Sequence, residues 1–296
     1  METKNTPSRK LRKILESGEF VVAPGVYEML SAKIADSMPF AALYMTGYGI
    51  SASHLGQPDA GLAGYTDMME RARTIAQGTR KPLIADADTG FGGLINVRNT
   101  VRGYEAAGVQ AIQLEDQEMP KKCGHTPNRR VVPVADAVRR VQVAVDSRRS
   151  DDFLVIARTD ARTSQGIDAA IERGRRFIKA GADIVLIESP ESEDEFKKVG
   201  AELAGQGAWL IANMVPSGRS PELSAAQLKA YGFSLAIWPG ALMAAACSAI
   251  EGTLKYLAEK GTTAGCPVPR YDMTQLHALV GFQEVWDFEK KYAETQ

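Results

Sequence analysis

Carboxylates, a thiol and cations share one short segment of the chain, which reads Glu-Asp-Gln-Glu-Met-Pro-Lys-Lys-Cys-Gly-His from Glu115 to His125. Glu115 is a candidate metal ligand. Cys123 stands directly after two lysines, and cations beside a thiol favour the thiolate, the form that exchanges protons or attacks carbon. The segment therefore predicts a reactive cysteine near a metal-binding carboxylate.

Three further carboxylates extend the candidate metal site. Asp86 and Asp88 follow a short apolar run, and Asp59 lies in an earlier polar segment. Carboxylates grouped without histidine or thiolate suit Mg²⁺ or Mn²⁺ rather than zinc. With Glu115 these acids predict a divalent cation site. The alternative is that they pair with arginines or cap helices, and loss of activity on metal removal distinguishes the two interpretations.

The elements that must position these residues alternate regularly along the chain. Short apolar runs predict buried strands, at residues 20–22, 41–45, 82–85, 111–114, 153–157, 184–187, 209–212 and 234–237. Helical periodicity lies between them, at residues 67–77, 96–107, 135–145, 167–180 and 193–203. Two of these helices end in Ala-Gly, where glycine can cap the helix. The alternation predicts a (β/α)₈ barrel.

Polar residues stand where six or more of the predicted strands end. They are Thr46, Gly47, Tyr48, Asp86, Asp88, Glu115, Asp116, Arg158, Asp160, Glu188, Asn213 and Pro239. Barrel enzymes build their active sites at the carboxyl ends of the strands. A single residue of this kind can simply mark the point where solvent begins, but the whole set predicts one active site.

Composition limits the classes of function. The 296 residues carry a net charge of −1, which provides no general field for nucleic acid or an anionic membrane. No apolar run reaches the length of a membrane span or a signal peptide, and three cysteines are too few for a disulfide scaffold. We therefore expect a cytoplasmic protein with a small-molecule substrate.

The end of the chain is expected to form a separate extension. We expect residues 1–260 to form the barrel domain and residues 261–296 a C-terminal helical extension. An apolar helix at 241–257 precedes a loop, and a final helix at 273–292 carries several aromatic side chains. This is more apolar surface than a terminal tail should expose. The extension is therefore expected to pack on the barrel or on a neighbouring subunit.

Six segments together resemble the isocitrate lyase and phosphoenolpyruvate mutase superfamily. They are Tyr-Met-Thr-Gly at 44–47, Leu-Gly-Gln-Pro-Asp at 55–59, Asp-Ala-Asp-Thr-Gly-Phe-Gly at 86–92, Leu-Glu-Asp-Gln at 114–117, Lys-Lys-Cys-Gly-His at 121–125 and Ala-Arg-Thr-Asp-Ala at 157–161. The resemblance spans nearly the whole chain, from residue 24 to residue 261. It also implies a (β/α)₈ barrel.

The Lys-Lys-Cys-Gly-His segment resembles the carbon–carbon lyase branch, which includes isocitrate lyase, 2-methylisocitrate lyase and 2-alkylmalate lyases such as dimethylmalate lyase. This branch implies a Mg²⁺-dependent cleavage of a 2-hydroxy di- or tricarboxylate to pyruvate, or another 2-oxo acid, and a carboxylate. Carboxyphosphonoenolpyruvate mutase looks similar in this region and remains an alternative. Oxaloacetate hydrolase is a further alternative.

The resemblance implies a role for each residue of the site. Asp86 would contact the metal directly, with Asp59, Asp88 and Glu115 acting largely through water. Cys123 would protonate the carbanion, and Lys121 and His125 would stabilise anionic charge. Tyr44 would serve as the base with help from Arg158, or else be a core aromatic residue. The remaining residues would complete the substrate pocket: Thr46, Gly47, Tyr48, Gly124, Glu188, Asn213 and Pro239.

Departures from the family pattern bear on the substrate. Tyr48 replaces the glycine of methylisocitrate lyases, which predicts a smaller pocket suited to a 2-alkylmalate. Pro216 replaces an acidic residue of the relatives. Pro239 resembles the lyases rather than oxaloacetate acetylhydrolase, which has serine there. The family also implies a homo-oligomer, commonly a dimer of dimers in which the last barrel helix is exchanged between subunits.

Overall fold

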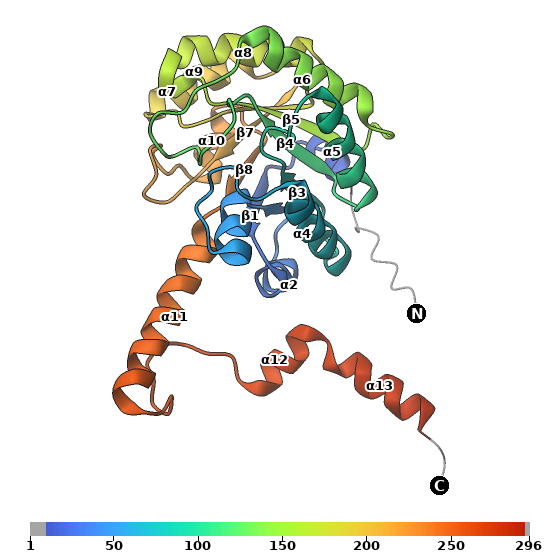
Figure 1. The fold of residues 1–296 in the computed structure, drawn as a ribbon, viewed down its shortest axis with the longest axis vertical. Coiled ribbons are helices and arrows are strands. Elements are labelled where there is room, and N and C mark those ends of the chain that lie inside the picture. Colours follow the sequence, from blue (N-terminus) through green and yellow to red (C-terminus); the bar gives the residue numbers. More distant parts are fainter. Residues whose placement is uncertain (1–9, 294–296) are drawn as a thin grey trace. The chain divides into compact units, whose positions relative to one another are not determined.

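Eight parallel strands form a closed barrel in the computed structural model, which describes residues 10–293 (Figure 1). Each strand pairs with the next one in the sequence, and β8 pairs with β1. The strands are β1 (Val21–Val26), β2 (Leu43–Met45), β3 (Leu83–Asp86), β4 (Ala111–Glu115), β5 (Leu154–Thr159), β6 (Ile184–Ile187), β7 (Trp209–Asn213) and β8 (Leu235–Trp238). The predicted (β/α)₈ barrel is confirmed.

Helices follow the strands and surround the barrel (Figure 1). They are α1 (Leu11–Glu16), α2 (Met29–Ser37), α3 (Gly47–Ile50), α4 (Tyr65–Gly78), α5 (Leu94–Ala106), α6 (Val134–Ser147), α7 (Arg162–Gln165), α8 (Ile167–Lys179), α9 (Glu193–Leu203) and α10 (Ala225–Ala230). A π-helical turn, η1 (Ser51–Leu55), continues α3. Each predicted helix of the barrel is present within a few residues of its expected bounds.

Two apolar layers stabilise the barrel. One buried cluster includes side chains from all eight strands. Within a strand its members are two residues apart, as Leu154 and Ile156 are in β5 and Leu235 and Ile237 are in β8. Residues two apart point to the same side of a strand, so this cluster fills the barrel interior. On the outside, α8 buries Ala170, Ile171 and Phe177 at helical spacing. The site therefore rests on a rigid, fully packed support.

Glycine ends the two helices that carry the Ala-Gly signal. Gly108 follows α5 with φ 95°, and Gly181 follows α8 with φ 94°. Their amides donate to carbonyls in the last turn of each helix, at 3.1 Å for Gly108 and 3.0 Å for Gly181. A residue with a side chain is strained in this left-handed conformation. The predicted glycine caps are confirmed.

The chain divides into two compact units, residues 1–241 and residues 242–296. The helix α11 (Ala241–Lys260) thus belongs almost wholly to the second unit, whereas the expected domain boundary grouped it with the barrel. The helical stretch predicted at 273–292 is present with a break in it. It is two helices, α12 (Met273–Val280) and α13 (Phe282–Tyr292), because Gly281 between them has a φ of 91°.

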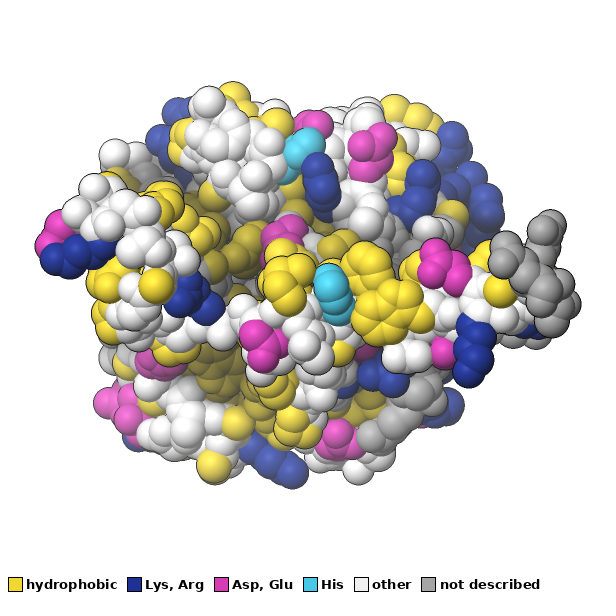
Figure 2. Space-filling view, turned by 90° about the horizontal axis from the view of Figure 1, so that it is seen from below, with side chains coloured by type: hydrophobic (Ala, Val, Ile, Leu, Met, Phe, Trp, Pro, Cys, Tyr) yellow, Lys and Arg dark blue, Asp and Glu magenta, His cyan; other side chains and the backbone are white. Residues whose placement is uncertain are grey.

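The C-terminal unit buries none of its helical side chains. Its surface carries large apolar residues that are 39–62% exposed, among them Phe282, Trp286 and Phe288. Figure 2 shows hydrophobic side chains lying open on the surface of the protein. Within residues 10–293, no helix combines the length and apolarity needed to cross a membrane.

Candidate active site

Buried carboxylates meet at the carboxyl ends of β3 and β4. Asp86 Oδ2 accepts a hydrogen bond from the Gly47 amide, and Asp86 Oδ1 accepts one from the Asp88 amide, both at 3.2 Å. The Lys121 ammonium contacts Asp59 and lies 2.5 Å from Asp88 Oδ1. All of these side chains are largely buried. The structure thus brings the predicted metal-binding acids together around a lysine of the Cys123 segment.

Three of these acids, Asp86, Asp88 and Glu115, have raised pKa values. Burial raises the pKa of Asp88 to about 7, and Asp86 and Asp59 add to the shift although Lys121 opposes it. Burial also raises the pKa of Asp86, against the opposing charges of Lys121 and Arg158. The pKa of Glu115 lies well above its usual value, again chiefly through burial. Nearby cations therefore do not fully compensate the negative charge of this cluster.

A divalent cation suits this cluster. Its donor atoms are carboxylate oxygens, and Glu115 Oε1 is buried without a hydrogen-bond partner among the described residues. No three acid, histidine or cysteine side chains within residues 10–293 converge closely enough to form a complete ligand cage. A divalent cation bound here would need further ligands from water, as Mg²⁺ usually does. The direct role of Asp86 stays a prediction.

Arg158 at the end of β5 connects the acid cluster to the next strand. Its guanidinium donates two hydrogen bonds to Asp160, at 2.8 and 2.9 Å, and lies 3.3 Å from both Glu115 and Glu188. The strand register places Glu115 directly beside Arg158. Because three carboxylates hold it, the guanidinium has a fixed position at the mouth of the barrel.

Glu188 at the end of β6 is held in its ionised form. Burial alone would raise its pKa, but Arg158, His125 and Asn213 together bring it well below the usual range. Asn213 at the end of β7 donates its amide to both Glu188 oxygens, at 3.2 and 3.0 Å. Its Oδ1 then lies buried without a partner among the described residues. That oxygen is available to a substrate hydroxyl.

The segment that carries Cys123 is fixed to the barrel mouth at several points. The Cys123 amide donates to the Asp59 carbonyl at 3.0 Å, and Ser189 Oγ donates to the Gly124 carbonyl at 2.9 Å. A Cβ on Gly124 would lie only 2.9 Å from the Glu188 carboxyl carbon. Gly124 is therefore needed for the segment to approach the site this closely.

The environment of Cys123 raises the pKa of its thiol, against the effect expected of two adjacent lysines. Burial raises the pKa of Cys123 to about 11, and the charges of Asp59 and Glu188 contribute to the shift. The lysines fail to lower it because Lys121 pairs with the acid cluster and Lys122 is exposed. A protonated thiol suits a proton donor better than a nucleophile.

At pH 7 the folded protein should react slowly with iodoacetamide at Cys123. A pKa of about 11 in place of the ordinary 9.0 leaves roughly 100-fold less thiolate. The rate should rise continuously from pH 8 to pH 11. Mass spectrometry of the peptide that contains Cys123 measures it, with urea-unfolded protein as the control that reacts faster. Rapid alkylation of folded protein at pH 7 would show that the site holds a thiolate.

His125 has a defined orientation. Its Nδ1 accepts a hydrogen bond from the Arg219 amide at 3.0 Å, so the neutral ring carries its proton on Nε2. That nitrogen lies 3.3 Å from Glu188 Oε1. A Cβ on Gly218 would lie 2.6 Å from His125 Nδ1. The segment after β7 therefore fixes both the tautomer and the position of a ring on another loop.

The remaining predicted residues differ in how exposed their side chains are. Tyr44 is a core residue, and its hydroxyl accepts from Gln113 at 3.0 Å. Burial and Asp86 raise its pKa well above the usual value despite Arg158, which favours the core interpretation over an ionised base. Thr46 caps α3 through the Gly49 amide, Tyr48 is 44% exposed, and Pro239 is half-buried. The effect of Tyr48 on the size of the pocket stays a prediction.

Several contributors to the site have weak or absent sequence signals. Ser189 directly follows Glu188, and the same strand-end pattern that identified Glu188 could have indicated it. Gln113 holds the Tyr44 hydroxyl from within β4 and carries no such signal. The Arg219 contribution is a backbone amide, which leaves no mark in residue type. Gly218 acts through the absence of a side chain, and only the folded structure shows which ring it accommodates.

Comparison with known proteins supports the resemblance drawn from the sequence. Residues 11–258 match the family model for phosphoenolpyruvate phosphomutase. The chain is 46% identical to 2,3-dimethylmalate lyase of Eubacterium barkeri, over 96% of this chain and 97% of that protein. It is 39% identical to 2-methylisocitrate lyase of Aeropyrum pernix, over 98% of this chain and 91% of that protein.

Solved structures show the same fold over almost the full length. Oxaloacetate acetylhydrolase in complex with 3,3-difluorooxalacetate aligns with a TM-score of 0.92 at 38% identity, over 98% of each chain. Phosphonopyruvate hydrolase in complex with oxalate and Mg²⁺ aligns with a TM-score of 0.87 at 29% identity, over 98% of this chain and 100% of that one. The predicted superfamily and barrel are confirmed.

Proposed function

Because the chain belongs to the phosphoenolpyruvate mutase and isocitrate lyase superfamily, we propose that it is a Mg²⁺-dependent carbon–carbon lyase acting on a 2-alkylmalate such as 2,3-dimethylmalate. The products are a 2-oxo acid and a saturated carboxylate. The observation that carries the proposal is the position of the Cys123 segment, which is held at the barrel mouth where Gly124 lies against Arg158 and Glu188. A lyase of this kind must deliver a proton to the carbanion that it creates.

The reaction breaks the bond between C2 and C3 of the malate skeleton. A base removes the proton of the C2 hydroxyl and passes it to solvent, and C2 becomes the carbonyl carbon of the 2-oxo acid. The bonding electrons pass to C3, next to the second carboxylate, and Cys123 Sγ donates its proton to C3. For 2,3-dimethylmalate the products are pyruvate and propionate, which balances all atoms without an oxidant or reductant. The thiolate then regains a proton from water.

The metal requirement rests on the buried acids. Asp86, with Asp59, Asp88 and Glu115 around it, would hold the ion, and the related phosphonopyruvate hydrolase has been solved in complex with Mg²⁺. A bound divalent cation supplies Lewis-acid polarisation of the substrate hydroxyl and carboxylate. Its positive charge would favour the ionised form of acids such as Asp88, whose pKa burial raises. Mn²⁺ has the same preference for oxygen ligands and should substitute.

The other residues position the substrate and its developing charge. Arg158 stabilises negative charge from a fixed guanidinium, and Asn213 Oδ1 offers an acceptor to a hydroxyl. His125 directs its Nε2 hydrogen toward Glu188, whose own carboxylate stays ionised. The loop between Glu115 and His125 excludes water while the thiol lies over the substrate.

A substrate panel tests the proposal. Purified protein with Mg²⁺ is incubated with 2,3-dimethylmalate, other 2-alkylmalates, 2-methylisocitrate, isocitrate and oxaloacetate, and release of pyruvate or glyoxylate is followed by a coupled assay. We expect 2-oxo acid release from a 2-alkylmalate at the highest kcat/KM. Phosphorus NMR of the protein incubated with carboxyphosphonoenolpyruvate tests for mutase activity. A new carbon–phosphorus bond would contradict the lyase proposal.

Hydrolysis of oxaloacetate is the second candidate function. The high structural similarity to oxaloacetate acetylhydrolase, at a TM-score of 0.92, is the observation that favours it. Pro239 argues for a lyase, since it resembles the lyase pattern and not the serine expected of the hydrolase at that position. Formation of oxalate and acetate from oxaloacetate, with no cleavage of any 2-alkylmalate, would establish this alternative.

Replacing Gly218 with alanine should lower kcat by roughly 10- to 100-fold, because the added Cβ displaces the His125 ring from its position against Glu188. KM should change less, since the metal-binding acids are untouched. Steady-state kinetics and a thermal melt measure the two effects. Gly93→Ala is the matched control, because a Cβ there meets nothing within 4 Å. Equal kcat in both variants would exclude a positioning role for Gly218.

We further propose that the protein is a cytoplasmic homo-oligomer, a dimer of dimers formed through the C-terminal unit. All three cysteines are free, which suits a reducing compartment. The exposed apolar residues of α11–α13 give a large surface for a second copy of the chain to cover.

Replacing Trp286 with aspartate should dissociate the oligomer, because a charge cannot be buried cheaply in an apolar interface. Sedimentation velocity of the wild type should show a tetramer, and the variant should sediment as smaller species. Lys290→Asp, a change of charge on the same helix, is the control. A monomeric wild type at micromolar concentration would contradict the proposal.

A further inference from the structure

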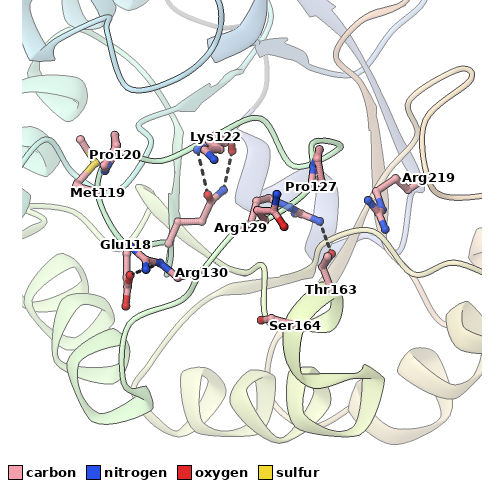
Figure 3. Close-up of a pocket in the computed structure, with 12 residues that line it drawn as sticks. Glu118, Met119, Pro120, Lys122, Pro127, Arg129, Arg130, Thr163, Ser164 and Arg219 are labelled. Atoms are coloured by element: carbon pink, nitrogen blue, oxygen red, sulfur yellow. Dashed lines mark hydrogen bonds and ion pairs between the residues drawn. The ribbon is translucent and has the colours of Figure 1, made fainter.

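A cavity of about 700 Å³ is lined in large part by residues 117–130, on both sides of Cys123 in the sequence (Figure 3). The segment closes at its base through an antiparallel bridge between Gln117 and Val131. Residues from this segment form one wall, Thr163 contributes from α7, and Arg219 contributes from the segment after β7. The volume lies within the range of small-molecule sites, about 300–1,000 Å³.

The lining of this cavity is strongly basic. It includes four cations, Lys122, Arg129, Arg130 and Arg219, and a single acid, Glu118. Figure 3 shows Arg130 and Arg219 on opposite sides of the cavity, with Lys122 and Arg129 between them. This imbalance predicts a preference for anions, in a protein whose overall charge is close to neutral.

Internal ion pairs leave part of this positive charge uncompensated. Arg130 pairs with Glu118 at 2.9 Å. Arg219 lies 3.2 Å from Glu191, and Arg162 shares that carboxylate at 2.6 Å while it also pairs with Glu195 at 2.8 Å. Lys122 has no hydrogen-bond or ion-pair partner for its ammonium group among the described residues. An anion in the cavity would therefore find at least one free ammonium and two partly compensated guanidinium groups.

Hydrogen bonds within the protein already hold the framework around the cavity in place. Arg129 is 3% exposed, and its guanidinium contacts Asp160 and Thr163. The Lys122 backbone is clamped on both sides by the Gln117 side chain, at 2.8 and 3.0 Å. Successive lysines thus face different sites, since Lys121 enters the acid cluster and Lys122 lines the cavity.

We propose that this cavity is a second binding site, for a small anion with two or more negative charges of the carboxylate or phosphate class. The anion contacts Lys122, one residue before Cys123, and Arg219, whose amide holds His125. Its binding joins the Cys123 segment to the segment after β7 and stabilises both in the arrangement seen here. The site is separate from the acid cluster, whose negative charge repels such an anion in the absence of metal.

Isothermal titration calorimetry tests the proposal with citrate and, separately, with inorganic phosphate, in metal-free buffer at ionic strength held constant with sodium chloride. We expect saturable binding of one anion per chain for at least one of them, and the two titrations distinguish the carboxylate and phosphate sources. The double variant Lys122→Gln with Arg219→Gln should weaken binding by about tenfold or more, because each change removes a charged donor. Hydrogen exchange of residues 117–131 should slow when the anion is bound.

Two controls separate this site from the lyase site. Arg139→Gln removes an exposed, ion-paired arginine on α6 and should leave the affinity unchanged. Asp86→Asn alters the acid cluster and should also leave it unchanged. No saturable heat with either anion, equal affinity in the double variant, or loss of binding in Asp86→Asn would overturn the proposal. None of these readouts depends on turnover, so they are independent of the proposed lyase reaction.

Discussion

Serine in place of Cys123 is expected to lower kcat for 2-alkylmalate cleavage by roughly 10² to 10⁴-fold, with a smaller change in KM. A hydroxyl gives up its proton far less readily than a thiol, even a thiol whose pKa burial has raised to about 11. The side chains are nearly the same size, so the backbone contacts of the segment to Asp59 and Ser189 should persist. Steady-state kinetics measures the loss.

Cys247→Ser is the matched control, since it makes the same chemical change at an exposed position of α11. The thermal melting temperature of both variants should stay close to that of the wild type. Normal turnover in Cys123→Ser would remove the thiol from the reaction. The proposed loop would then serve only to exclude water.

Asparagine in place of Asp86 is expected to abolish metal-dependent turnover, with a loss of about 10³-fold or more. Lewis-acid polarisation is worth several kcal/mol in the transition state, and loss of a direct ligand removes it. The variant also loses a local contact, because both Asp86 oxygens accept backbone amides and an asparagine amide group cannot accept one. Calorimetric titration with Mg²⁺ should show an affinity at least about 100-fold weaker.

Asp168→Asn provides the comparison for this change, because Asp168 is an exposed acid that pairs with Lys198 on the barrel surface. It should bind Mg²⁺ and turn over substrate like the wild type. Wild-type protein stripped of metal should be inactive and should recover on addition of Mg²⁺. Full activity of the stripped protein would show that the acids have a structural role.

The barrel could be predicted because its signal is local and repeated. Each strand is a short apolar run buried on both faces, and the helices between them place apolar residues at helical spacing, as α8 does. The short helices α1 and α2 were missed because six to nine residues give too few turns for a clear period. The break at Gly281 was missed because an isolated glycine also occurs inside helices.

The membership of the site could be predicted as well, since parallel strands bring their ends to one face. The protonation states of the site residues could not be predicted from the sequence. Adjacent lysines suggested a thiolate at Cys123, yet the state of the thiol depends on burial and on where each ammonium points. The same holds for Tyr44, whose pKa burial raises even though an arginine lies nearby. Residue types identify the charges present, and only the fold determines the distances between them.

Proton NMR of 2,3-dimethylmalate incubated with the protein and Mg²⁺ in D₂O tests the central claim most directly. A lyase with a thiol proton donor predicts equal amounts of pyruvate and propionate, with one deuterium at C2 of the propionate because the Cys123 thiol exchanges with solvent. Cys123→Ser should form both products far more slowly. Unchanged 2,3-dimethylmalate after prolonged incubation, in a sample that converts oxaloacetate to oxalate and acetate, would contradict the lyase assignment.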